Sequence, residues 1–303
     1  MAKKHKAVRI VFLALVLMFS LTACSVDTTY PGTKNIVEAS QVGKDYLSGG
    51  KVIVIDAREP EAYAKGHLKG AISLTPTELS VSTPVPGLLA PKAQIESVLS
   101  SKGIANDSII YVYDENGGVY SGRVWWVLKV YGHENVMIVN GGSKALVNEK
   151  LELTADAASL PATKYVAKEA DTSMIATFED VKSLTETPVD GTVIVDVRSQ
   201  AEYDAGYIPT AVLYPHTKNL YSDGTFMSSR DLGLFYKDAG ITKDENIILY
   251  CKTSFRATQT AALLQEAGFT NIKVYDGAWV EWEQKGTVAG PETPAPVGPS
   301  DGS

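Results

Sequence analysis

The sequence predicts an α/β protein of two tandem domains, each an open, mainly parallel sheet flanked by helices. Three observations support this prediction. The chain has 303 residues, a length that suits two domains of roughly 100–200 residues. Short apolar runs alternate with longer helical stretches, as expected where parallel strands are joined by crossover helices. The second half of the chain also repeats phrases of the first, and a repeat this long indicates a duplicated domain, not a solenoid.

Each repeat begins with a buried-strand run that ends in an aspartate and, two residues later, an arginine. These residues are Asp56 and Arg58 in the first repeat and Asp196 and Arg198 in the second. Two more apolar runs follow in each repeat, and helical stretches separate them. Strands are therefore expected at 51–56, 108–113, 135–139, 192–196, 246–250 and 271–275.

Composition shifts and the repeat divide the chain into six parts. The stretch 151–168 has no strong period and is predicted to be a linker, and the proline-rich end is predicted to be disordered. The predicted parts are a signal peptide at 1–23, a tether at 24–34, the first domain at 35–150, the linker at 151–168, the second domain at 169–287 and the tail at 288–303.

The composition excludes several classes of protein. Residues are 45% hydrophobic, 21% charged and 9% aromatic, which is typical of a globular protein with a core and not of a disordered chain, a fibre or a polytopic membrane protein. The formal net charge of −7 argues against sequence-independent binding of nucleic acid, which needs a basic face. Two cysteines cannot form a disulfide scaffold.

The amino-terminal segment has the pattern of an export signal. A basic head is followed by an apolar run shorter than the ~20 residues of a membrane-spanning helix. The ending Leu21-Thr22-Ala23-Cys24 resembles the bacterial lipoprotein signal, which implies cleavage before Cys24 and acylation of that cysteine. We then expect an extracytoplasmic protein anchored in the membrane, on the periplasmic side if the cell has two membranes. The alternative is an ordinary signal peptide in which Cys24 is incidental.

The other cysteine stands where a reactive thiol is expected. Cys251 follows a predicted parallel strand and opens a short loop into a helix, the edge of the sheet at which α/β folds bind ligands. Amides at the start of the helix and the cations of Lys252 and Arg256 favour the thiolate form. The first repeat has Asp114 at this place, so only the second repeat is expected to be catalytic. The alternative is a buried structural cysteine.

The repeated motifs resemble those of the rhodanese family of sulfurtransferases, over about residues 35 to 287. The resemblance rests on the paired Asp-x-Arg, the phrases that begin at Gly66 and Gly206, and the glycines Gly141 and Gly277 after the third strand. Such enzymes often have two tandem domains. The stretch from Arg123 to His133, with its two tryptophans, is similar to their first domain.

The resemblance implies a mechanism. The Cys251 thiolate takes a sulfur atom from a small anionic donor such as thiosulfate, and a thiol or cyanide then takes it from the persulfide. It implies neither a metal nor an organic cofactor. The implied donor-binding residues are those of the loop after the cysteine, with support from the first-strand acid and arginine of the second repeat. They are Lys252, Thr253, Ser254, Phe255 and Arg256, with Asp196 and Arg198.

The chain departs from the family at several points. Its catalytic loop matches neither the thiosulfate nor the mercaptopyruvate pattern, and Glu202 stands where some thiosulfate enzymes have an arginine. Four residues separate Cys251 from Arg256, which favours sulfur transfer over the five-residue loop of related phosphatases. Since Asp56 and Arg58 repeat the second-domain pair, we expect that pair to hold the fold. Thr253 and Ser254 are expected to cap the helix, and hydroxyl bonds to the donor are the alternative. A lipoprotein that binds a sulfur carrier or partner without catalysis remains the alternative function.

Overall fold

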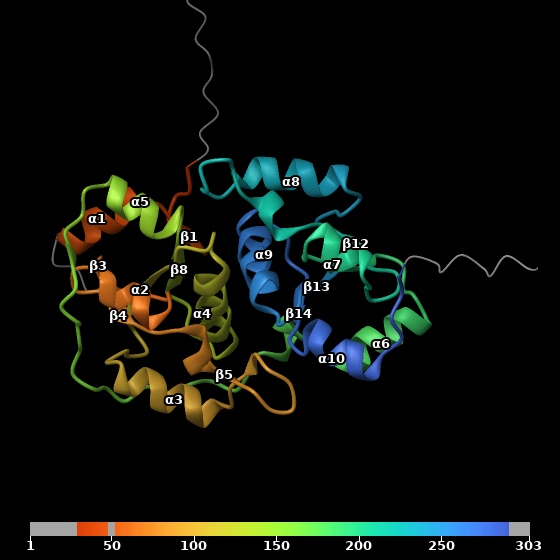
Figure 1. Ribbon diagram of the computed structural model, residues 1–303, viewed down its shortest axis with the longest axis horizontal. Helices are drawn as coiled ribbons and strands as arrows, with labels where there is room; N and C mark the ends of the chain where they lie inside the picture. Colours follow the sequence, from red (N-terminus) through yellow and green to blue (C-terminus); the bar gives the residue numbers. More distant parts are fainter. Residues whose placement is uncertain (1–28, 48–51, 291–303) are drawn as a thin grey trace, which may run out of the picture.

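The computed structural model describes residues 29–47 and 52–290 and shows two α/β halves side by side (Figure 1). Domain 1 holds the elements before residue 155, and domain 2 those after residue 171. Each half contains one five-stranded sheet. The strands of these sheets are β1 (Ile36–Val37), β2 (Val52–Asp56), β4 (Ile72–Ser73), β7 (Ile109–Tyr113), β8 (Val136–Val139), β10 (Ile175–Ala176), β11 (Thr192–Asp196), β12 (Val212–Leu213), β13 (Asn246–Tyr250) and β14 (Ile272–Tyr275).

The two sheets have the same topology. Their orders are β1-β8-β7-β2-β4 and β10-β14-β13-β11-β12, and all paired strands in them run parallel. The register also matches, because Asp56 pairs with Tyr113 in domain 1 and Asp196 with Tyr250 in domain 2. The predicted fold class, two tandem α/β domains with parallel sheets, is therefore confirmed.

Helices cover both sheets, and two of them meet at the centre of the molecule (Figure 1). They are α4 and α9, one from each domain. Gly122 permits their close approach, since a Cβ atom there would lie 2.8 Å from the Gln259 backbone. One cluster of buried apolar side chains extends through both domains. The helices are α1 (Ala39–Leu47), α2 (Pro60–Lys65), α3 (Lys92–Ser101), α4 (Val119–Val130), α5 (Gly142–Asn148), α6 (Phe178–Glu186), α7 (Gln200–Asp204), α8 (Ser229–Asp238), α9 (Phe255–Glu266) and α10 (Ala278–Lys285).

The predicted linker lies along domain 1. Its strand β9 (Leu153–Thr154) pairs antiparallel with β3 (His67–Leu68). Farther along, the Thr163 amide donates to the Ser100 carbonyl at 3.0 Å, and the Lys168 amide donates to the Tyr131 carbonyl at 3.0 Å. These bonds fix the connection between the two domains onto the first one.

Both ends of the described chain are held more firmly than the sequence predicted. Tyr30, in the predicted tether, is 5% exposed, and its hydroxyl donates to the Met227 carbonyl of domain 2. At the other end, Ala289 of the predicted tail forms an antiparallel bridge with Tyr207, so the tail prediction is wrong for residues 288–290. The remainder of the predicted tail, the signal peptide and Cys24 lie outside the described residues.

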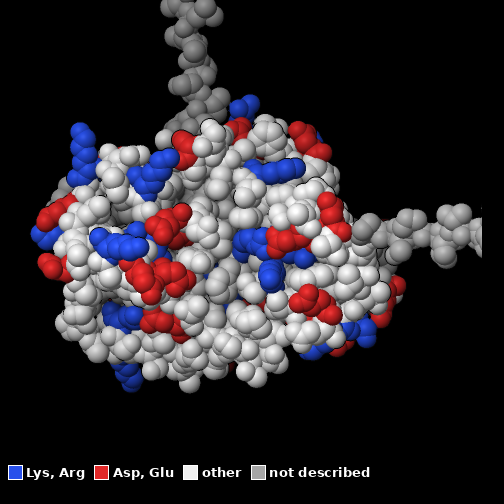
Figure 2. Space-filling view, viewed as in Figure 1, with Lys and Arg blue, Asp and Glu red and all other residues white. Residues whose placement is uncertain are grey.

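The surface carries charges of both signs. On the face drawn in Figure 2, positive and negative side chains of the described residues are interspersed over both domains. Within residues 29–47 and 52–290, the structure contains no helix with the length and apolar character needed to cross a bilayer.

Candidate active site

The Cys251 side chain lies at the boundary between the two domains. It follows β13 directly and begins the loop that leads into α9. The residue is 1% exposed, but it lines a cavity of about 360 Å³. Residues of both domains form the walls of this cavity. They are Glu59, Pro76, Thr77, Asn116, Val119 and Tyr120 of domain 1 and Cys251, Thr253, Phe255 and Arg256 of domain 2.

The loop that carries the cysteine is fixed by hydrogen bonds to α10. The Cys251 carbonyl accepts from the Trp279 amide at 2.9 Å, and the Lys252 carbonyl accepts from the Val280 amide at 3.2 Å. Ser254 has a φ of +67°, a left-handed conformation that turns the chain into α9. The cap predicted for Ser254 is wrong: its hydroxyl caps no amide among the described residues and lies 3.1 Å from the Asp276 carboxylate instead.

An arginine of domain 1 also donates a hydrogen bond to this loop. Arg123, on α4, is fully buried and forms an ion pair of 2.7 Å with Asp276. It also donates to the Ser254 hydroxyl at 3.0 Å and to the Gly87 carbonyl at 2.7 Å. Sequence reasoning used Arg123 only as a family marker. Its place within an apolar helical run was a signal, because a buried charge requires a partner.

The corresponding loop of domain 1 shows what this backbone can bind. Asp114 follows β7 as Cys251 follows β13. One carboxylate oxygen accepts from the amides of Asn116 and Gly118, at 2.9 and 3.0 Å, and the other accepts from those of Tyr120 and Ser121, both at 2.8 Å. The amides of this strand-to-helix loop thus surround an anionic group. The loop after Cys251 is a comparable strand-to-helix turn but one residue shorter, since α9 begins at Phe255 and α4 at Val119.

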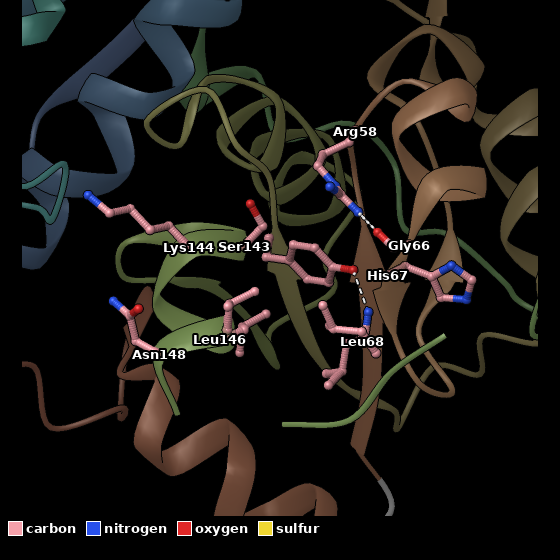
Figure 3. Close-up of a pocket in the computed structure, with 11 residues that line it drawn as sticks. Arg58, Gly66, His67, Leu68, Ser143, Lys144, Leu146 and Asn148 are labelled. Carbon is pink, nitrogen blue, oxygen red and sulfur yellow. Dashed lines mark hydrogen bonds between the residues drawn. The ribbon is translucent and has the colours of Figure 1, made fainter. Parts of the chain in front are cut away.

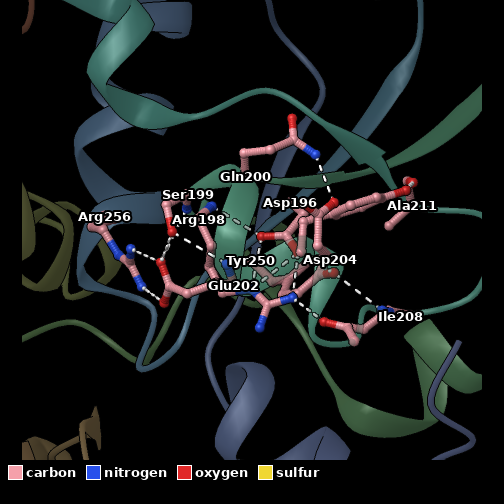
Figure 4. A network of polar contacts seen from close by, with 12 residues as sticks. Asp196, Arg198, Ser199, Gln200, Glu202, Asp204, Ile208, Ala211, Tyr250 and Arg256 are labelled. Carbon is pink, nitrogen blue, oxygen red and sulfur yellow. Dashed lines mark hydrogen bonds and ion pairs between the residues drawn. The ribbon is translucent and has the colours of Figure 1, made fainter. Parts of the chain in front are cut away.

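The two predicted cations differ in their positions. Arg256 lines the cavity, and its guanidinium forms two hydrogen bonds of 2.7 Å with the Glu202 carboxylate (Figure 4). Hydrogen bonds from Arg256, the largest cause, and from Ser199 lower the pKa of Glu202 from 4.5 to about 2, although burial acts in the opposite direction. Glu202 is in turn the largest cause of a raised pKa at Arg256, to which the neighbouring Cys251 also contributes. Lys252 is exposed and is not one of the described residues that line the cavity, so its role beside the thiol stays a prediction.

The predicted supporting pair serves the fold. Arg198 donates to both carboxylate oxygens of Asp196, which also accepts from the Tyr250 hydroxyl at 2.6 Å (Figure 4). Arg198 also donates to the Gly206 carbonyl at 2.7 Å. Neither residue of the pair is among the described residues lining the Cys251 cavity. Domain 1 has an equivalent pair, so the interpretation of Asp196 and Arg198 as fold-holding residues fits the structure.

The Cys251 thiol is the candidate nucleophile among the titratable groups near the loop, of which His216 and Tyr120 are two others. Burial, followed by the charge of Arg256, lowers the pKa of His216, and its Nδ1 lies 3.3 Å from the Val197 carbonyl. Burial, followed by the charge of Glu59, raises the pKa of Tyr120, so this hydroxyl of the cavity stays protonated. Among the described residues, no three His, Cys, Asp or Glu side chains are grouped so that they could hold a metal ion.

Comparisons with known proteins agree with this geometry. The model of the rhodanese-like domain matches residues 40–149 and 177–285. The chain belongs to the rhodanese family. It is 30% identical to a Mycolicibacterium smegmatis protein named "Putative thiosulfate sulfurtransferase", over 82% of this chain and 94% of that protein. It is also 30% identical to the sulfur carrier protein TtuD of Thermus thermophilus, over 79% of this chain and 90% of that protein.

Solved structures show the same fold. SseA of Escherichia coli, a 3-mercaptopyruvate sulfurtransferase, aligns with a TM-score of 0.74 and 27% identity, over 82% of this chain and 99% of that one. EanB aligns with a TM-score of 0.76 at 18% identity, which shows likeness of fold alone.

Proposed function

We propose that this rhodanese is a sulfurtransferase that moves a sulfane sulfur from a donor such as thiosulfate to a thiol or cyanide through a Cys251 persulfide. The observation that carries the proposal is the position of Cys251. Its thiol lines an interdomain cavity at the start of a loop whose counterpart in domain 1 surrounds a carboxylate with amides. The names of the relatives, which refer to thiosulfate, 3-mercaptopyruvate and sulfur carriage, support the same chemistry.

The reaction consists of two displacements at sulfur. The Cys251 thiolate attacks the outer sulfur of thiosulfate; a new S–S bond forms, the old one breaks, and sulfite leaves with the bonding electron pair. An acceptor thiolate, or cyanide, then attacks the outer sulfur of the persulfide and releases the Cys251 thiolate. Loop amides stabilise the anionic sulfur in both steps, and neither step requires a metal or an organic cofactor.

The test separates catalysis from binding. The protein is incubated with thiosulfate or 3-mercaptopyruvate, with cyanide as acceptor, and thiocyanate is followed together with the mass of the protein. We expect turnover and a mass gain of one sulfur atom, both absent in Cys251→Ser. The matched control Ser183→Ala, on α6, should behave as the parent protein. If neither donor gives turnover or persulfide, the chain instead binds a sulfur carrier or partner protein without catalysis.

We also propose that the mature protein is extracytoplasmic and anchored in the membrane by acyl chains on Cys24. The lipoprotein-like signal supports this location, and removing its four cations from a chain of net charge −7 leaves −11. Because such a body is repelled by anionic lipids, the anchor must supply the attachment. Cys24→Ala should move the protein from the membrane fraction to the soluble one. Retention of the variant in membranes would contradict anchoring at Cys24.

A further inference from the structure

The two repeats differ sharply at one position after the third strand. The Trp279 amide donates to the Cys251 carbonyl at 2.9 Å, and the Ser143 amide donates to the Asp114 carbonyl at 2.8 Å. These matching bonds make Ser143 the structural counterpart of Trp279. A large aromatic side chain in domain 2 is thus replaced by a small one in domain 1.

In domain 2 the indole of Trp279 covers an arginine. The guanidinium carbon of Arg198 lies 4.2 Å from the centre of the Trp279 ring system and 5.5 Å from that of Tyr250. The indole also reaches Gly206, where an added Cβ atom would lie 3.4 Å from it. Such contacts place a flat ring against a cation, an arrangement that is favourable because the face of the ring carries partial negative charge.

In domain 1 the equivalent arginine, Arg58, has no indole ring of the described residues packed on it. The Arg58 guanidinium carbon lies 5.6 Å from the Tyr113 ring, as in domain 2, but Ser143 provides no ring opposite. A cavity of about 210 Å³ lined by Arg58, Tyr113 and Ser143 is present instead (Figure 3). Gly66, the counterpart of Gly206, has no described atom within 4 Å of an added Cβ. The Arg58 side chain is 10% exposed, against 3% for Arg198.

The walls of this cavity are mostly apolar. Leu68, Leu146, Val147 and Leu153 line it, and Val147 and Leu153 at its rim are 50% and 47% exposed. The Lys144 ammonium points away from it (Figure 3) and donates to the Asp223 carbonyl at 3.1 Å. The cavity therefore offers apolar sides and one delocalised cation, without a second positive charge that would select an anion.

We propose that this domain 1 cavity binds a neutral planar aromatic ring of indole size, stacked on the Arg58 guanidinium. Trp279 of domain 2 shows the bound arrangement within the same chain. The ring could belong to a small heteroaromatic molecule or to a tryptophan side chain of another protein, since both present the same surface. The proposal does not depend on the sulfur-transfer reaction, because the cavity is separate from the one that Cys251 lines.

Calorimetric titration of the purified protein tests this proposal. The probes are free indole, the peptide Gly-Trp-Gly and, as an apolar control without a ring face, cyclohexanol. We expect saturable binding of indole at one site and at least tenfold weaker binding of cyclohexanol. If the peptide binds as tightly as indole, the ring belongs to a protein side chain. If indole binds and the peptide does not, the ring belongs to a small molecule.

Two variants test whether indole binds in this cavity. Ser143→Trp supplies the ring from within and should abolish indole binding, whereas the matched control Ser143→Ala should leave it unchanged within twofold. If Ser143→Trp fails to fold, Trp279→Ser provides a second measurement, because it should open an equivalent cavity over Arg198 and raise the stoichiometry from one site to two. Absence of saturable indole binding at about 10 mM, equal binding of cyclohexanol, or binding that Ser143→Trp leaves intact would overturn the proposal.

Discussion

The ion pair between Arg256 and Glu202 makes a strong prediction about donor binding. An anionic donor that uses Arg256 must compete with the Glu202 carboxylate, which already forms two hydrogen bonds of 2.7 Å to it. The pKa of Glu202 falls from 4.5 to about 2, with Arg256 as the largest cause and Ser199 as a further one, which corresponds to about 3.5 kcal/mol at about 1.4 kcal/mol per unit. Because the Glu202 side chain is 33% exposed, solvent screening reduces the usable part to about 1–2 kcal/mol.

Glu202→Gln removes the competing charge and keeps the shape of the side chain. We expect kcat/KM for thiosulfate to rise about 5- to 30-fold, because about 1–2 kcal/mol no longer opposes contact between the donor and Arg256. The gain should appear mainly as a lower KM. Initial rates of thiocyanate formation over a range of thiosulfate concentrations measure it.

The control for this variant is Glu186→Gln, an exposed carboxylate on α6 outside the lining of the Cys251 cavity. It should leave the kinetic constants unchanged. If Glu202→Gln left kcat/KM for thiosulfate unchanged or lowered it, Arg256 would not contact the donor, and the ion pair would serve only to position the loop.

The same contacts predict effects on stability. Since the folded pKa of Glu202 lies below its unfolded value, its contribution is present above pH 4.5 and lost as the pH falls towards 2. Urea unfolding at pH 5 and pH 3 should therefore show a loss about 1 kcal/mol smaller in Glu202→Gln than in the parent, and equal losses would contradict the pairing. Arg123→Met leaves Asp276 buried without its ion pair and should lower the free energy of unfolding by about 3–5 kcal/mol, whereas a change below about 1 kcal/mol would show that the interdomain pair is not stabilising. Asp114→Asn weakens charge-assisted bonds from four amides and should cost about 2–4 kcal/mol by the same measurement; an unchanged midpoint would refute the anion cradle.

The features that the sequence predicts well are local or periodic. Apolar runs of strand length and a duplicated Asp-x-Arg phrase specify the two parallel sheets, because each repeat presents the same pattern independently. Cys251 could be located for a similar reason: a residue directly after a central parallel strand must lie at the carboxyl edge of the sheet.

The features that the sequence predicts poorly depend on pairs of residues far apart in the chain. Arg123 meets Asp276 across 153 positions, and Glu202 meets Arg256 across 54. The apolar run around Arg123 indicates that its charge is buried, but for all four residues only packing decides which partner each one finds. Ser254 also has typical cap chemistry, but its left-handed backbone directs the hydroxyl away from the helix amides.

The shared cavity bears on how this protein could evolve. Cys251 belongs to one copy of the duplicated unit, whereas six of the ten described residues that line its cavity belong to the copy with Asp114 at the equivalent place. The domain 1 residues that line this cavity can therefore change without altering the loop after Cys251, and such changes would reshape the cavity. If the proposed function holds, selection for a new donor would then act on the domain that lacks the cysteine.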